Sequence, residues 1–167
     1  MQTVFLLHLT GVAVLWDLKY RKIPNGLIAA GLLCGLWQQV YESGSAGAGV
    51  YFSGILLPIV FPGILYYFRM IGAGDIKLLC VIGGYLGPKQ VLWCIVYTFL
   101  FGGVISAVLI IKRKNLFKRF FYFKTYLSQF LETKQWRPYR IPGDEDGSFC
   151  FTIPVFFGVV CVLGGAG

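Results

Sequence analysis

The sequence predicts an all-α membrane protein with about six transmembrane helices and its N-terminus outside. Of the 167 residues, 57% are hydrophobic and only 13% are charged, and a soluble domain of this length cannot bury so much apolar surface. The apolar residues gather in long runs, and the basic residues lie between these runs. Both observations favour a chain that crosses a membrane several times.

Six apolar runs are expected to form the helices of a single membrane-embedded domain, residues 1–167. They cover residues 2–18, 26–41, 50–68, 72–87, 89–111 and 149–166. A helix that crosses a bilayer needs about 20 residues, so three runs are near that length and three are short. The first run is not expected to be a signal peptide, because its basic residues follow it instead of preceding it.

The loops expected on the inner side hold every basic residue except Lys89. The inner loops are residues 17–25, 69–77 and 112–148, and the outer loops are 42–49 and 87–90. Because inner loops carry an excess of Lys and Arg, this asymmetry predicts an outer N-terminus in the cytoplasmic (inner) membrane. Topology explains the net charge of +8, so nucleic-acid binding is not expected.

The long inner loop contains a basic amphipathic segment, at about 112–148. Apolar residues recur with helical spacing among its lysines and arginines: Leu116, Phe120, Phe123, Leu127 and Phe130. This pattern predicts a helix that lies on the anionic lipids of the inner leaflet. A solvated cytoplasmic loop with incidental aromatic residues is the alternative.

The five cysteines give no sign of a metal or of a disulfide framework. They are Cys34, Cys80, Cys94, Cys150 and Cys161, and no two of them form a CxxC pair. Nearly all lie in apolar runs, where cysteine serves as a small buried side chain. The sequence therefore predicts no metal site and no cofactor.

Two aspartates carry the expected chemistry. Of the seven acidic residues, only Asp17 and Asp75 adjoin apolar runs on the inner side. The run that follows Asp75 is too short to cross the membrane from Lys77, which draws Asp75 to the membrane surface or below it. Two neighbouring carboxylates do not both ionise easily, so one activates water while the other protonates the leaving amine. The alternative is that the two aspartates only balance the charge of neighbouring basic residues in the inner loops.

Glycine and proline flank both aspartates. Gly72 and Gly74 precede Asp75, and they are expected to allow positive φ and the close approach of an extended substrate. We interpret Lys77, two residues later, as an anchor at the membrane interface.

On the other side, Ile23, Pro24 and Asn25 follow Asp17 and are expected to form a rigid turn beneath it. Asn25 is suited to cap the next helix.

These two blocks resemble the paired motifs of type IV prepilin peptidases and archaeal preflagellin peptidases. The first is Asp17 with the Ile-Pro-Asn sequence at 23–25, and the second is the GxGD motif at 72–75 with the family's following lysine. A weaker match is residues 153–158, which resemble the family's final helix with its proline and glycine. The resemblance covers nearly the whole chain.

The resemblance implies an aspartyl endopeptidase that removes the short basic leader from prepilin-like proteins at the cytoplasmic face. Asp17 and Asp75 match the family's catalytic pair. The chain lacks the insertion with paired CxxC motifs that accompanies methylation, so it resembles the small, cleavage-only members. N-methyltransferase activity is not expected.

Two other functions fit part of the pattern. A small proton- or cation-coupled transporter component also carries acidic residues within the membrane, although such sites usually lie near the midplane. A non-catalytic subunit of a secretion machine would keep its function without either aspartate. The substrate's identity and the oligomeric state stay open.

Overall fold

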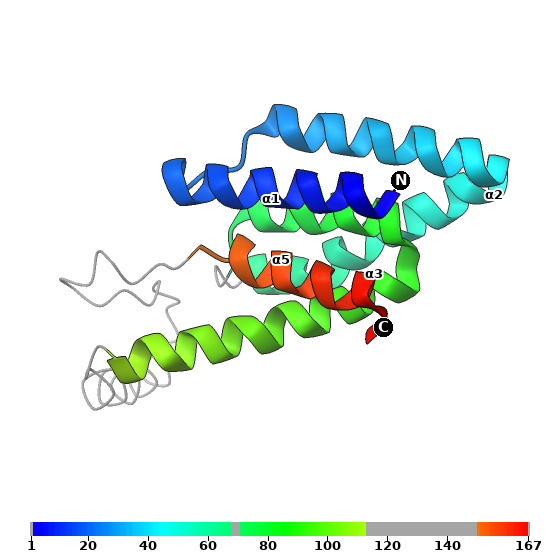
Figure 1. The fold of residues 1–167 in the computed structure, drawn as a ribbon. Coiled ribbons are helices and arrows are strands. Elements are labelled where there is room, and N and C mark those ends of the chain that lie inside the picture. Colours follow the sequence, from blue (N-terminus) through cyan, green and yellow to red (C-terminus); the bar gives the residue numbers. More distant parts are fainter. Residues whose placement is uncertain (1, 68–70, 113–149, 167) are drawn as a thin grey trace, which may run out of the picture. The chain divides into compact units, whose positions relative to one another are not determined.

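The computed structural model describes residues 2–67, 71–112 and 150–166, which are helical almost throughout and include no strand. The helices are α1 (Gln2–Tyr20), α2 (Asn25–Tyr67), α3 (Ala73–Lys112) and α5 (Thr152–Cys161), followed by the π-helical turn η1 (Val162–Ala166) (Figure 1). The predicted all-α class is confirmed. Beyond Lys112, the basic segment predicted at 112–148 lies outside the described residues.

The chain divides into two compact units. The first contains residues 1–102 and 150–167, and the second contains residues 103–149. The described part of the second unit, residues 103–112, forms the last turns of α3.

Within α2 the chain reverses direction at Gly44, which has φ 58° and ψ −138°. The hydroxyl of Tyr51 donates a hydrogen bond to the carbonyl of Leu32 at 2.8 Å, whereas a straight helix would separate these residues by about 28 Å. The sequence predicted an outer loop at 42–49, but these residues are helical apart from Gly44. Glycine permits so sharp a break because it adopts positive φ without a steric penalty.

A second reversal, in α3, falls within the predicted break at 87–90. Gly87 has φ 78° and ψ 176°, and Pro88 follows it. A Cβ atom added at Gly83 would lie 3.3 Å from a methyl group of Val91, so the two arms of α3 fold against each other. The first arm, residues 73–86, is about 21 Å long, which is shorter than the roughly 30 Å apolar core of a bilayer. The helix begins at Ala73, so Asp75 lies in its first turn.

Gln39 of α2 donates hydrogen bonds to backbone carbonyls at the second reversal. Its side-chain amide donates to the carbonyls of Gly84 at 3.4 Å and Tyr85 at 3.0 Å. In an uninterrupted helix the carbonyl of Gly84 would accept from residue 88, but Pro88 has no N–H. The amide of Gln39 therefore supplies hydrogen bonds that the break removes.

The first arm of α3 is the centre of the unit, with every residue from Leu78 to Tyr85 buried. Glycines let neighbouring helices approach this arm closely. The backbones of Gly54 and Gly83 are in contact, and Leu9 and Val81 pack over Gly31. The largest fully buried aliphatic side chains are Leu6, Leu78, Leu79, Ile82, Val81, Val91, Val155 and Val159.

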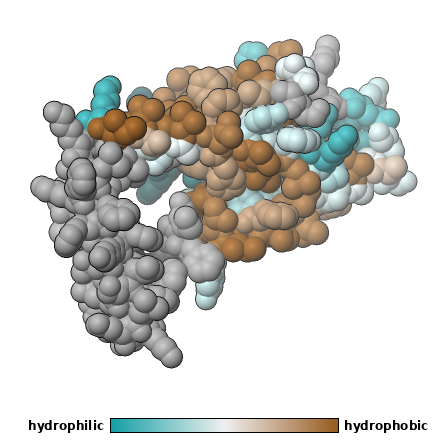
Figure 2. All heavy atoms as spheres, turned by 90° about the horizontal axis from the view of Figure 1, so that it is seen from below, coloured by the Kyte–Doolittle hydropathy of each residue, from teal (hydrophilic) through white to brown (hydrophobic). Residues whose placement is uncertain are grey.

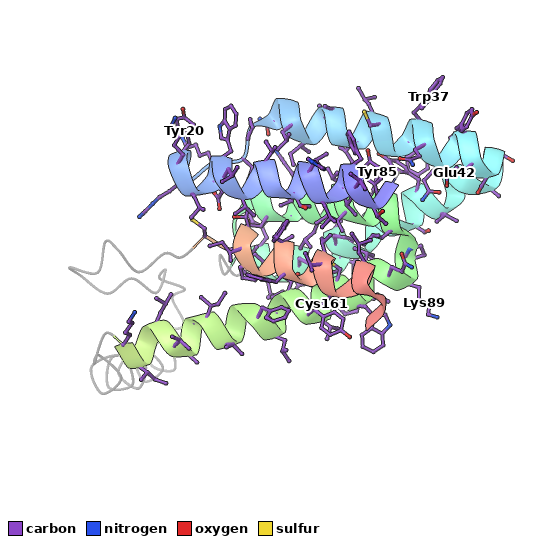
Figure 3. The ribbon with its side chains drawn as sticks, viewed as in Figure 1. Tyr20, Trp37, Glu42, Tyr85, Lys89 and Cys161 are labelled. Carbon is purple, nitrogen blue, oxygen red and sulfur yellow. The ribbon has the colours of Figure 1, made fainter. Side chains whose placement is uncertain are left out.

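The outer surface of the described residues is apolar over much of the face seen in Figure 2. Exposed aromatic residues lie near both ends of the helices: Trp16 and Tyr20 in the last turns of α1, and Trp37 and Tyr41 before the reversal in α2. Figure 3 labels Tyr20 and Trp37 at these two ends. Aromatic side chains at two levels are typical of the two interfaces of a membrane. Of the described helices, α1, α2 and α3 are long and apolar enough to span a membrane.

Candidate active site

Asp17 lies in the last turn of α1, which ends in an unusual conformation. Arg21 has φ 51°, a left-handed value that is uncommon for a residue with a side chain. Its N–H donates to the carbonyl of Asp17 at 2.7 Å. This geometry terminates the helix in the way a C-terminal glycine often does, and it fixes the backbone of Asp17.

The last helix supplies the hydrogen-bond partner of the Asp17 side chain. The hydroxyl of Thr152, the first residue of α5, donates to Asp17 Oδ2 at 2.8 Å, and Thr152 is fully buried. Sequence reasoning missed Thr152. The available signal was a hydroxyl at the start of the last apolar run, on the same expected side as both aspartates.

Cys150, just before α5, also contacts Asp17. Its thiol donates to the backbone carbonyl of Asp17 at 3.9 Å. Partial burial, followed by the negative charge of Asp17, raises the pKa of the Cys150 thiol. The thiol therefore remains a neutral donor.

Asp75 occupies the first turn of α3, where it takes part in a reciprocal cap. The carbonyl of Gly72 accepts the backbone N–H of Asp75 at 3.2 Å, and the Asp75 carboxylate accepts a hydrogen bond from the backbone of Gly72. A carboxylate three residues after the cap closes the start of a helix in this way.

The expectation of positive φ at Gly72 and Gly74 was wrong. In the described chain, the glycines with positive φ are Gly44, Gly87 and Gly165. A Cβ atom at Gly72 would lie 3.1 Å from Asp75 Oδ2, so the glycine leaves room for the carboxylate. A Cβ atom at Gly74 would only touch Ile23, at 3.5 Å.

The two aspartates come from different helices but lie close enough for the charge of Asp17 to act on Asp75. Cys150 interacts electrostatically with both. The ends of α1, α3 and α5 that carry these residues lie at one end of the first unit (Figure 1). This arrangement can hold one protonated and one ionised carboxyl group side by side.

The remaining motif residues tie the starts of α2 and α3 together. The ammonium group of Lys77 donates to Asn25 Oδ1 at 2.9 Å, which links the GxGD motif to the Ile-Pro-Asn motif. Pro24 provides the helix cap expected of Asn25, because its carbonyl accepts the N–H of Leu27 at 3.1 Å. Ile23 packs beside Gly74.

The described residues contain no group of three or more His, Cys, Asp or Glu side chains that could hold a metal ion. The groups suited to catalysis near Thr152 are the carboxyl groups of Asp17 and Asp75. The fold and the site therefore define a helical membrane protein with a candidate acid–base site at one end of its helices.

Residues 4–108 match the model of the type IV leader peptidase family. The match covers more than half of the chain, so the chain belongs to the type IV leader peptidase family, and membership implies a protease with a prepilin-like substrate. Both motifs fall within the matched residues, whereas Thr152 falls outside them. No curated protein and no solved structure matches this chain.

Proposed function

We propose that this protein is an aspartyl endopeptidase that removes the short basic leader from type IV prepilin-like proteins at the cytoplasmic face of the membrane. Asp17 and Asp75 form its catalytic pair. Family membership supports a leader peptidase. The assignment to these residues is supported by the electrostatic interaction of Asp17, in the last turn of α1, with Asp75, in the first turn of α3.

The pair hydrolyses a peptide bond by sharing one proton. The ionised carboxylate takes a proton from a water molecule, which attacks the scissile carbonyl carbon. The protonated partner donates its proton to the departing amine, whose bond to that carbon breaks. The water proton held by the first carboxylate then restores the starting state.

Six membrane crossings follow if the reversals in α2 and α3 each divide a helix into two spans and the shorter apolar helix α5, with η1, forms the sixth. Positions 44 and 87 then lie outside, and the ends that carry Asp17 and Asp75 lie inside, on the side to which the sequence pattern assigns Lys19, Arg21 and Lys22. A single cysteine at Ser45, in a variant without the native cysteines, should react with an impermeant thiol reagent in intact cells. A cysteine at Lys22 should stay unlabelled, and its labelling would overturn this orientation.

The substrate is a prepilin-like chain whose leader emerges at the inner membrane surface. We propose cleavage without N-methylation, because the sequence contains no CxxC pair of the kind that accompanies methyl transfer in larger relatives.

The test is co-expression of the peptidase with a candidate prepilin in cells that lack their own leader peptidase. A gel should show the prepilin shortened by the wild-type enzyme, with a new N-terminus directly after the leader. The Asp17→Asn and Asp75→Asn enzymes, expressed in equal amounts, should leave it uncut. Cleavage by either variant would contradict the assignment.

A further inference from the structure

α5 brings one buried hydroxyl to the site from outside the matched part of the chain. Thr152 is fully buried and its hydroxyl donates to Asp17 Oδ2 at 2.8 Å. We propose that Thr152 is a positioning residue that holds the Asp17 carboxylate in one orientation by donating a hydrogen bond to it. This inference rests on the proposed function, because it assigns a partner to the same catalytic pair.

The location of Asp17 explains why such a donor is needed. The carboxylate is attached to the last turn of α1, where the partial negative charge of a helix C-terminus disfavours another negative charge. The backbone N–H of Arg21 and the thiol of Cys150 both donate to the carbonyl of Asp17. The Cys150 thiol also hydrogen-bonds the Asp17 side chain, but a thiol is a weaker donor than a hydroxyl.

Thr152 supplies two compensating effects. Its hydroxyl has one proton, and a hydrogen bond donated to a carboxylate oxygen stabilises the ionised form of a carboxylate. Thr152 also begins α5, so the partial positive charge of that helix N-terminus lies at the same place. Burial of the hydroxyl strengthens the contact, because water does not compete for it.

Other charged and titratable groups also lie near the Asp17 carboxylate. Asp75 of α3 interacts with Asp17, and Cys150, just before α5, interacts with both aspartates. Arg21, at the end of α1, acts on Cys150. These groups remain unchanged when only the Thr152 hydroxyl is removed, so the effect of that change reports on the hydroxyl itself.

The test compares Thr152→Val with Thr152→Ser in purified enzyme cleaving a prepilin in detergent. Valine keeps the shape of threonine but has no hydroxyl, so kcat should fall roughly 10- to 100-fold with KM little changed. The acidic limb of the pH–rate profile should move to higher pH, because the ionised pair has lost a donor. Serine keeps the hydroxyl and should restore both kcat and the limb.

Thr98→Val is the matched control, because Thr98 is equally buried but packs against Gly158, further along α5. It should leave kcat and the pH profile unchanged. If Thr152→Val does not fold, Thr152→Ala removes the hydroxyl without adding bulk and should show the same loss.

Wild-type kcat and pH profile in Thr152→Val would overturn the inference while leaving the proposed function intact. An equal loss in Thr152→Ser would also overturn it, because packing and not the hydroxyl would then matter. If the wild-type enzyme does not cleave, or an Asp→Asn variant does, the proposed function fails and this inference fails with it.

Discussion

The two ends of the helical unit both carry polar side chains, but these side chains make different kinds of contact. Near the reversals, Gln39 donates its amide protons to the carbonyls of Gly84 and Tyr85. At the other end, Asp17 accepts a hydrogen bond from Thr152, and the charge of Asp17 acts on Asp75. Figure 3 shows Tyr20 at the site end and Glu42 and Lys89 at the reversal end.

This difference separates polar groups that complete the fold from those that carry chemistry. A side chain that supplies hydrogen bonds missing at a helix break stabilises the protein, and its loss should change stability. Two carboxylates in electrostatic contact oppose each other's ionisation, which makes a poor stabilising contact but a suitable acid–base pair. The predictions below test this separation, in decreasing order of their effect on cleavage.

The largest effect is expected from neutralising either aspartate. Asp17→Asn or Asp75→Asn should lower the cleavage rate by at least about 10³-fold, because each carboxyl group has a separate task. Purified enzyme and a prepilin in detergent provide the measurement. Glu42→Gln removes one acid at the opposite end and should cleave like the wild type. A similar loss in that control would mean that both ends take part.

A smaller but still large effect is expected from pH. At low pH both carboxyl groups are protonated and no base remains, whereas at high pH both are ionised and no acid remains. Initial rates should therefore fall by more than about tenfold on either side of a maximum. Melting curves at each pH identify losses caused by unfolding. A rate that rises to a plateau, with the protein folded throughout, would contradict a shared proton.

A moderate effect is expected where the two motifs are tied together. Lys77→Met removes the bond to Asn25, and an exposed hydrogen bond of this kind corresponds to a loss of roughly fivefold in kcat/KM. Asn25→Leu should cost the same, and the double variant no more than either. Lys19→Met, another lysine at this end, is the control. Additive losses would show that Lys77 and Asn25 act separately.

No effect on cleavage is expected from Gln39→Leu, which should act on stability alone. It leaves the carbonyls of Gly84 and Tyr85 without their donor, at a cost of about 1–3 kcal/mol. The melting temperature in detergent should fall, while the rate per folded molecule stays unchanged. Gln38→Leu changes the neighbouring residue, whose amide reaches only Glu42 at 3.5 Å, and should melt like the wild type.

Composition and spacing predicted the all-α class and the break near Gly87, because each depends on local sequence alone. A reversal at 42–49 was predicted, but the helical conformation of these residues on both sides of Gly44 was missed, since eight residues of low hydropathy resemble a loop whether or not they stay helical. The negative φ of Gly72 depends on the cap formed with Asp75. Thr152 was missed because its partner lies on another helix, and one sequence does not reveal which helices meet.

The most direct test of the account is whether Asp17 and Asp75 act as one unit. The residual cleavage rates of Asp17→Asn, Asp75→Asn and the double variant should be measured with the enzymes purified from cells that lack a leader peptidase. Once one member of a pair is lost, the other has no task left, so the double variant should be within about threefold of the slower single variant. Losses that multiply in the double variant, or a near-normal rate from either single variant, would contradict the pair.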